Sequence, residues 1–297
     1  MDTSICISNE TLQAVTGTYT GRRINVKEYA AVPLPDGSVI NGVITDEHRF
    51  GQALDELCLK FHKNAFSNVR IVMASNQIYV KRMLVPPLSS KQMLEYVANA
   101  FTEVGNNEEL LFDYTLLGKE DPATGTPALL CAAQKSLIAS YVSLFTARQI
   151  SISCIDTMHT SQLKLIRLLP STKTQSCIVL AFDGNNLSAT LYIDGQFRFA
   201  NRTRLFAERG TPEGFTEVER MVSSILQFNL SERSGATITN VYMTGLHENE
   251  TPVIGRIETA FGLEAAVLSD PDGVIASGGA EFDLSAYSYA VGNLIRM

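Results

Sequence analysis

The sequence predicts a mixed α/β fold built from two similar domains, and an internal repeat is the main reason. Residues 177–182 form a short, continuously apolar run, which is typical of a strand buried on both faces. Turn residues follow at 183–186, then a second strand at 187–193 and the Asp194-Gly195 pair of a tight hairpin. The same order of strand, turn, strand and turn recurs near the N-terminus, from Ile5 to Gly21. Such a repeat indicates two like domains, although two β-meanders can also resemble each other by chance.

Length and composition agree with a globular chain of two domains. The chain has 297 residues, 45% of them hydrophobic and 19% charged, so it can bury a full core. A net charge of −7 argues against a nucleic-acid surface or a polybasic membrane anchor, because both need clustered Lys and Arg. We find no bilayer-spanning apolar run and no signal peptide, and therefore expect a cytoplasmic protein without direct membrane insertion. The five scattered cysteines are expected to be reduced.

We place the first domain at residues 1–170. Strands are expected at 5–7 and through 24–32, and a helix capped by Asp46 carries its apolar residues on one face. A further buried strand is predicted at 69–74. The pattern predicts that a strand at 150–155 returns to this domain after an insertion, and a helix then ends near residue 170.

The insertion itself is predicted at about residues 77–149, where the pattern changes to β–α–β–β–α. A strand at 79–84 precedes a helix that begins at the capping box Ser89–Gln92. Strands at 111–117 and 127–133 and a helix from Ser136 complete the unit. Asp113, in the first of these two strands, is expected at an edge or facing outward.

We place the second domain at residues 171–297, beginning with the hairpins described above. A capping box at 216–219 opens a helix, and a strand at 238–243 ends just before Gly245. A short helix carries Ile254, Ile257 and Phe261, and the last helix is expected at about 285–296.

None of the common catalytic or metal-binding motifs is present. The chain has no Gly-rich phosphate loop, no GxSxG and no HExxH, and we expect neither a catalytic residue nor a metal site. His159 follows Asp156 at helical spacing, which would suit a catalytic pair, but a local surface hydrogen bond is the simpler interpretation. The acidic pairs Glu108-Glu109 and Glu248/Glu250 are expected in solvated loops.

The order and spacing of these elements resemble the type IV pilus assembly protein PilM family, a relative of the division protein FtsA. The resemblance covers nearly the whole chain, and no single motif carries it alone. The matching stretches are residues 34–46, 80–87 with the helix after them, 112–114, 155–156 with their helix, 241–245 and 289–292. The resemblance implies an actin-like ATPase (ribonuclease H-like) fold of two domains with an FtsA/PilM-type inserted subdomain.

The departures from the family concern the nucleotide cleft. Actin-like ATPases hold phosphates between Gly-containing turns through backbone N–H groups. Ser8 and Asp183 stand where the family has glycine in the first and second turns, Glu10 brings a carboxylate to the phosphate position, and Leu246 replaces the second glycine of the adenosine-side turn. The degenerate cleft that the resemblance implies comprises Ser8, Asn9, Thr11, Gln13, Asp183, Gly184, Asn185 and Gly245.

One wall of that cleft is also reduced. The family has a helical subdomain, 2B, between the positions of Thr203 and Thr216, and the residues that remain here are too few for two packed helices. We therefore expect a cleft that is open on this side and holds no cofactor. Binding of ATP and Mg²⁺ is the alternative.

The resemblance implies a non-catalytic cytoplasmic scaffold of the type IV pilus, or a related secretion, inner-membrane platform. Its expected partner is the N-terminal cytoplasmic tail of a PilN-like membrane protein, which would recruit it to the membrane; other platform proteins or a second copy are further candidates. We expect the tail at a sheet edge or in a groove beside the insertion. The candidate contacts are Tyr79, Lys81, Met83, Leu84, Met93 and Val97. The alternatives are a nucleotide-hydrolysing actin-like switch and an FtsA-like membrane-tethered filament, for which the C-terminal residues offer no basic amphipathic helix.

Overall fold

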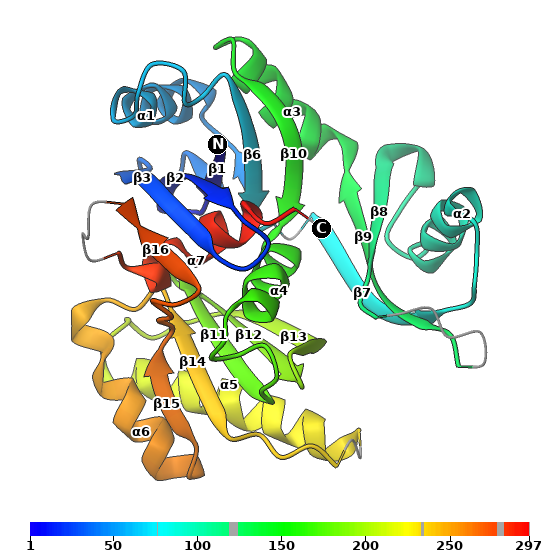
Figure 1. Cartoon of the computed structure of the whole chain (residues 1–297), viewed down its shortest axis with the longest axis vertical. Coiled ribbons are helices and arrows are strands. Elements are labelled where there is room, and N and C mark those ends of the chain that lie inside the picture. Colours follow the sequence, from blue (N-terminus) through cyan, green and yellow to red (C-terminus); the bar gives the residue numbers. More distant parts are fainter. Residues whose placement is uncertain (76, 119–123, 233–234, 278–281, 297) are drawn as a thin grey trace.

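The protein contains two large β-sheets that lie one above the other, with a smaller sheet at one side (Figure 1). The structure is a computed structural model. It describes residues 1–75, 77–118, 124–232, 235–277 and 282–296.

The first sheet has six strands in the order β10-β6-β1-β2-β3-β16. Its strands are β1 Asp2–Ile7, β2 Thr11–Tyr19, β3 Ile24–Pro33, β6 Asn68–Met73, β10 Ser151–Thr157 and β16 Val274–Ala276. The strands β1, β2 and β3 form an antiparallel meander, whereas β6 and β10 run parallel to β1. A short hairpin of β4 Val39–Ile40 and β5 Val43–Ile44 follows the meander.

The second sheet repeats this arrangement with five strands in the order β13-β12-β11-β14-β15. They are β11 Cys177–Asp183, β12 Asn186–Ile193, β13 Gln196–Arg204, β14 Asn240–Thr244 and β15 Glu264–Val267. Again three strands form an antiparallel meander, and two more extend it in parallel from its first strand. The internal repeat read from the sequence is therefore present in the fold.

Helices separate and cover the two sheets. The outer face of the first sheet carries α1 Glu47–Leu59 and α3 Lys135–Thr146, and the outer face of the second carries α5 Pro212–Ser231 and α6 Pro252–Phe261. The helices α4 Met158–Leu168 and α7 Leu284–Asn293 lie between the sheets (Figure 1). Alternation along the strands assigns each side chain to a layer, so that Ile5 and Ile7 of β1 face α1 and α3 while Cys6 faces α7.

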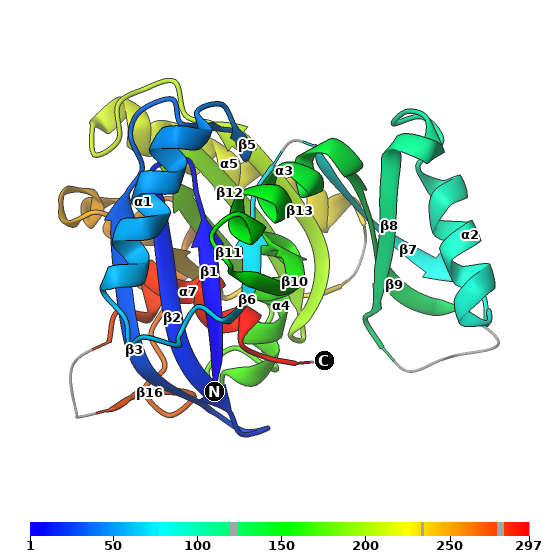
Figure 2. The ribbon, with the colours of Figure 1, turned by 90° about the horizontal axis from the view of Figure 1, so that it is seen from above.

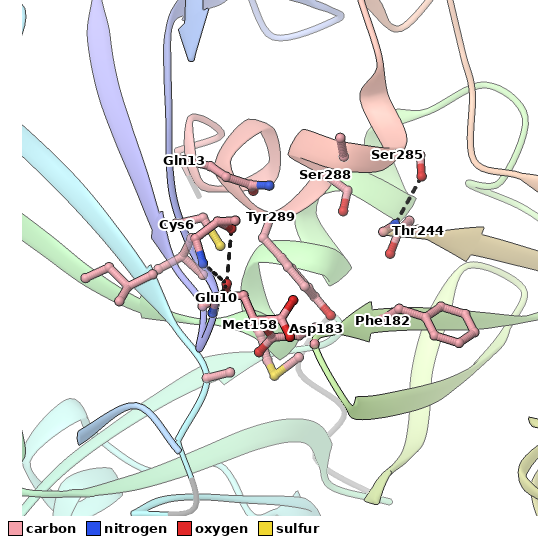
Figure 3. Close-up of a pocket in the computed structure, with 18 of the residues that line it drawn as sticks. Cys6, Glu10, Gln13, Met158, Phe182, Asp183, Thr244, Ser285, Ser288 and Tyr289 are labelled. Atoms are coloured by element: carbon pink, nitrogen blue, oxygen red, sulfur yellow. Dashed lines mark hydrogen bonds between the residues drawn. The ribbon is translucent and has the colours of Figure 1, made fainter. Parts of the chain in front are cut away.

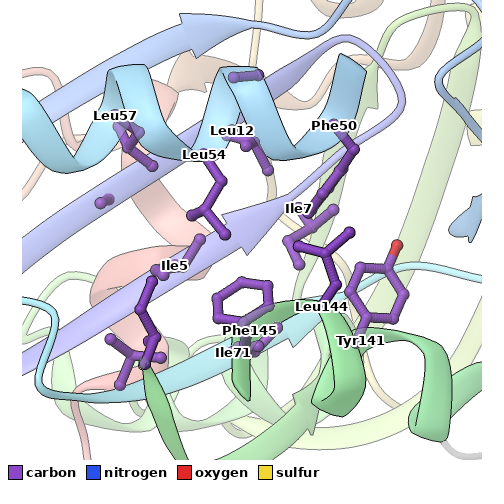
Figure 4. Close-up of a cluster of buried hydrophobic side chains, with 14 of the residues drawn as sticks. Ile5, Ile7, Leu12, Phe50, Leu54, Leu57, Ile71, Tyr141, Leu144 and Phe145 are labelled. Atoms are coloured by element: carbon purple, nitrogen blue, oxygen red, sulfur yellow. The ribbon is translucent and has the colours of Figure 1, made fainter. Parts of the chain in front are cut away.

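The core beneath α1 and α3 shows how the first half is held together (Figure 4). Phe50 of α1 meets Tyr141 of α3 edge to face, with ring centroids 5.8 Å apart. The buried Tyr141 hydroxyl donates to the Gly42 carbonyl at 2.7 Å, so its polar group is satisfied where burial would otherwise be costly. This bond ties α3 to the loop between β4 and β5.

The insertion between β6 and α3 is a three-stranded antiparallel sheet in the order β7-β9-β8, with a helix on its outer side (Figure 2). It comprises β7 Ile78–Val85, α2 Ser90–Ala100, β8 Leu110–Leu116 and β9 Thr126–Gln134, with a short 3₁₀ turn at Asn107–Glu109. The predicted capping box at the start of α2 is present. The range 77–149 read from the sequence extends one helix too far, because Leu137, Tyr141 and Phe145 of α3 pack in the core of the first sheet.

Two short strands depart from the sequence-based picture. Neither β15 nor β16 was expected, and β16 pairs with β3 in the first sheet although residues 171–297 were assigned to the second domain. Asp113 is exposed on the edge strand β8, as predicted. Residues 205–211 alone connect β13 to α5, so the reduction of the helical subdomain is confirmed.

Candidate functional site

Three turns and one helix end meet between the two halves and enclose a cavity of about 230 Å³ (Figure 3). The turns follow β1, β11 and β14, and the helix is α7. Of the residues predicted for the nucleotide cleft, the cavity is lined by Ser8, Thr11, Gln13, Asp183, Gly184 and Gly245. Asn185 is exposed, and its carbonyl instead accepts the N–H of Leu205, at 2.7 Å.

The turn after β1 uses its own backbone donors internally. Ser8 Oγ accepts the N–H groups of Glu10 and Thr11, at 3.1 and 2.9 Å. Phosphate binding at such a turn depends on N–H groups that point freely at the ligand. In this chain the Ser8 hydroxyl already accepts hydrogen bonds from two of these N–H groups.

The same turn reaches across to the turn after β11. The Asn9 N–H donates to Asp183 Oδ1 at 3.3 Å, and the Asn9 amide lies 3.5 Å from Asp183 Oδ2. Glu10 packs against Gly184, which has a positive φ of 53°, and a Cβ added to Gly184 would lie 2.5 Å from Glu10 Oε1. Thus two carboxylates stand where the resemblance would place a phosphate, and they would repel it.

Asp183 is a largely buried carboxyl group of the cavity. Its side chain is 11% exposed, and burial raises its pKa, while Arg202 at 3.6 Å and the Asn9 N–H partly offset this effect. Tyr289 points from α7 toward Asp183 (Figure 3), and burial followed by the nearby Cys6 and Asp183 raises the tyrosine pKa. These groups form a buried polar cluster, in which Asn9 Oδ1 and the Nε and Nη2 atoms of Arg202 make no hydrogen bond within the described part of the chain.

The turn at Gly245 is held by Arg209 and Ser285, which the sequence did not predict as site residues. Gly245 has a positive φ of 73°, and its N–H donates to Ser285 Oγ of α7 at 3.1 Å. Arg209, from the 205–211 connection, donates to the Gly184 and Gly245 carbonyls and to Glu250. Glu250 is 3% exposed and lies in the 3₁₀ turn Glu248–Glu250, so its predicted place in a solvated loop was wrong. No motif in the sequence marks Arg209 or Glu250.

His159 and Asp156 do not form the pair considered from their spacing. Asp156 accepts from Lys164 of α4 and from the Thr157 N–H, whereas the His159 ring packs edge-on against Phe197, with centroids 6.1 Å apart. Burial, and then the charge of Arg202, lowers the His159 pKa to about 4. The simpler expectation of a surface hydrogen bond for His159 was therefore wrong as well.

The residues proposed for partner binding lie mainly on the covered side of the small sheet. Met93 and Val97 of α2 are 3% and 0% exposed because they pack against this sheet. Tyr79 and Met83 pack against the same core, and Lys81 pairs with Glu103 and donates to the Ala100 carbonyl. Only Leu84, 56% exposed, is open to solvent among the apolar members of this set.

The opposite face of the small sheet borders a groove of about 340 Å³. One wall is formed by alternate residues of β7 and β9 and by residues 111–115 of β8. The other wall is formed by β10 and the start of α4. The lining residues include Val80, Cys131, Leu111, Asp113 and Ile155–Thr157. Two further cavities continue along β10, one beside α3 and one that ends at Arg70, Lys164 and Arg296.

The outer edge of β10 is open along this groove. In the sheet order β10 stands at one end, and no described strand pairs with its outer side. An unpaired strand edge offers a row of backbone N–H and C=O groups to an incoming extended segment. On β7, Val80 lines this groove, whereas the candidate contacts Tyr79 and Met83 lie on the other face of the strand, toward α2.

Two negative findings concern the described residues as a whole. Among them, we find no cluster of three or more His, Cys, Asp or Glu side chains that could hold a metal ion. No described helix combines the length and the apolar character needed to span a membrane.

Comparison with known proteins places this geometry in a family. A solved "PilM-PilN type IV pilus biogenesis complex" matches at 16% identity with a TM-score of 0.79, over 99% of this chain and 97% of that chain. The ethanolamine utilization protein EutJ from Carboxydothermus hydrogenoformans matches at 10% identity and a TM-score of 0.55, over 99% and 88% of the two chains. A Bacteroides thetaiotaomicron protein of unknown function with an actin-like ATPase fold matches at 11% identity and a TM-score of 0.52, over 91% and 93%.

These likenesses show the actin-like fold. A search of curated proteins found no match. The model of the family "Type IV pilus assembly protein PilM" matches residues 4–208, which is more than half of the sequence. The chain therefore belongs to the type IV pilus assembly protein PilM family.

Proposed function

We propose that this protein is a cytoplasmic scaffold of a type IV pilus, or related secretion, assembly platform, and that it works without hydrolysing ATP. Its partner would be the cytoplasmic N-terminal tail of a PilN-like membrane protein, which recruits it to the inner face of the membrane. Membership of the PilM family supports the setting, and the matched complex contains PilN as well as PilM. The observation that carries the proposal is the groove along the open edge of β10.

The groove suits an extended segment with apolar and basic residues. Backbone groups of β10 would pair with the segment, and apolar side chains would lie against Val80 and Cys131 of the small sheet. The exposed carboxylate of Asp113 lines the same groove and can pair with a basic residue. Cytoplasmic segments beside transmembrane helices are rich in Lys and Arg, which fits this charge.

A single pair of variants on β8 tests the groove. Leu111 lines it and is 43% exposed, whereas Leu116 of the same strand is 39% exposed and is not among the groove residues. We expect Leu111→Asp to weaken binding of a synthetic PilN-like N-terminal peptide at least about tenfold, because a carboxylate would be buried without a partner. Leu116→Asp should change the dissociation constant by less than about twofold. Calorimetric titration gives both values.

Equal affinities of Leu111→Asp and Leu116→Asp for the peptide would mean that the peptide binds outside this groove. Absence of any binding of this peptide to the unmodified protein would reject the proposed partner. Melting curves show whether each variant is folded, and both positions are open enough to accept a polar side chain.

The non-hydrolytic part of the proposal has its own test. We expect titration with Mg-ATP to give no heat and no shift in melting temperature. The reason is that the donors of the first turn are taken by Ser8 and that Glu10 and Asp183 face the phosphate position. Micromolar binding of Mg-ATP would contradict this expectation and favour a nucleotide-regulated switch. The peptide titration would stand independently of that result.

A further inference from the structure

Arg209 lies on the seven-residue connection 205–211 and is aimed into the cavity by its neighbours. Glu217 of α5 accepts the N–H groups of Phe206 and Ala207, at 2.9 and 3.1 Å, which fixes the start of the connection. Thr211 caps α5 and fixes its end. The arginine therefore projects from a segment held at both ends.

The guanidinium group makes four hydrogen bonds in this position. Nη1 donates to the Gly184 carbonyl and Nη2 to the Gly245 carbonyl, both at 2.9 Å. Nε and Nη2 donate to the two carboxylate oxygens of Glu250, at 2.6 and 2.5 Å. The side chains of Arg209 and Glu250 are 10% and 4% exposed, so this bidentate pair is largely out of water.

The two carbonyls belong to two turns of the second half that lie against the first half. The halves also meet where Leu163 and Ile166 of α4 pack on the second sheet. The turn at Gly184 contacts Asn9 and Glu10 of the first sheet's meander. The turn at Gly245 is bonded to Ser285 of α7, a helix that packs on the first sheet. The side chain of Arg209 therefore links the turn at Gly184 to the turn at Gly245.

We propose that Arg209 acts as a built-in ligand of the cleft, which holds both turns in place and keeps the two halves closed on each other when no small molecule is bound. The role is one of positioning. A lysine could pair with Glu250 but could not span both carbonyls, since only the planar guanidinium presents several donors at fixed angles. The proposal is independent of what binds along β10.

The chain contains a matched control for this arginine. Arg256 of α6 also pairs with a glutamate, Glu219, at 2.5 Å, and also lies over a phenylalanine ring, Phe215, at 5.7 Å. Arg209 lies over Phe182 at 5.1 Å. Arg256 is 37% exposed and its bonds do not reach either turn. Arg209 therefore bonds to both turns and Arg256 to neither, and this is the difference that the test uses.

The test compares Arg209→Ala with Arg256→Ala by thermal melting and by amide hydrogen exchange of the full chain. We expect Arg209→Ala to lower the melting temperature by roughly 6–12 °C, because it leaves Glu250 buried without its partner. We expect Arg256→Ala to lower it by about 2 °C or less, since exposed pairs contribute little. The exchange rates of the backbone amides of Asn9 and Gly245 should rise at least about tenfold in Arg209→Ala. In Arg256→Ala they should stay unchanged.

Chemical rescue supplies a second readout. Guanidinium chloride at about 20 mM should restore part of the lost melting temperature of Arg209→Ala, whereas sodium chloride at the same concentration should not. Unchanged exchange at Asn9 and Gly245 in a folded Arg209→Ala protein would overturn the proposal. If the alanine variant does not fold, Arg209→Lys takes its place, and exchange at the two turns equal to that of the unmodified protein would overturn the proposal in the same way.

Discussion

Replacing Gly292 with alanine is expected to lower the free energy of unfolding by about 3 kcal/mol. Gly292 lies where α7 crosses α4, and a Cβ added to it would lie 2.8 Å from Ser161 Oγ and 2.9 Å from the Ser161 carbonyl carbon, with the carbonyl oxygen closer still. Ser161 Oγ also donates to the Tyr289 carbonyl at 2.6 Å, which ties the two helices together. The added methyl group must push apart two backbones that are already bonded.

A second helical glycine provides the comparison. Gly255 of α6 is exposed, and a Cβ added there meets no heavy atom within 4 Å. Gly255→Ala should therefore stabilise the protein by about 0.5–1 kcal/mol through helix propensity alone. Urea unfolding followed by circular dichroism measures both variants. Equal stabilities would mean that α4 and α7 can separate at no cost, contrary to the close packing described.

Acidification from about pH 6.5 to pH 4 is expected to remove about 2 kcal/mol of stability through His159. Its pKa is lowered to about 4, first by burial and then by the charge of Arg202. The unfolded chain takes up this proton near pH 6.5, so the contribution is complete above that pH and is lost as the pH falls toward 4. The full difference in pKa corresponds to about 3 kcal/mol, and the residual exposure of the ring reduces the expected value to about 2 kcal/mol.

The measurement compares unfolding of the unmodified protein and of His159→Gln between pH 7 and pH 4. The stability difference between the two should shift by about 2 kcal/mol in favour of the variant as the pH falls. Asp183, whose raised pKa acts in the opposite direction, is present in both proteins and largely cancels in the difference. Curves that stay parallel over this range would show that the imidazole titrates as it does in the unfolded chain.

The sequence was most informative where a pattern extends over many residues. The continuous apolar run of β11 predicted a strand buried on both faces, and all residues from Cys177 to Phe182 are buried. The repeated meander predicted two like sheets. The short strands β15 and β16 gave no such signal, because four and three residues are too few to show a period and their pairing depends on distant strands.

The candidate site was harder to predict. Local turn residues predicted the turn at 183–186, the internal repeat predicted the turn after β1, and the family resemblance indicated the turn at Gly245. Which groups bond across the cleft depends on contacts such as Asn9 with Asp183, 174 residues apart. Arg209 and Glu250 lie far apart in the chain and resemble ordinary surface residues in sequence. On β7 the candidate contacts Tyr79 and Met83 turn out to pack under α2, because alternation separates two faces without saying which is covered.

The path of the C-terminal segment determines when this chain can fold during its synthesis. The helix α7 covers the inner face of the first sheet, where Asn293 donates to Ser4 Oγ at 3.1 Å and accepts from Arg70 at 2.7 Å. Arg296 then pairs with Asp2 at 2.7 Å. Leu165 of α4 already packs on this apolar face, but the part that α7 covers stays open until residues 284–296 have left the ribosome. Until then these apolar side chains are exposed on the nascent chain, and such surface is prone to aggregation.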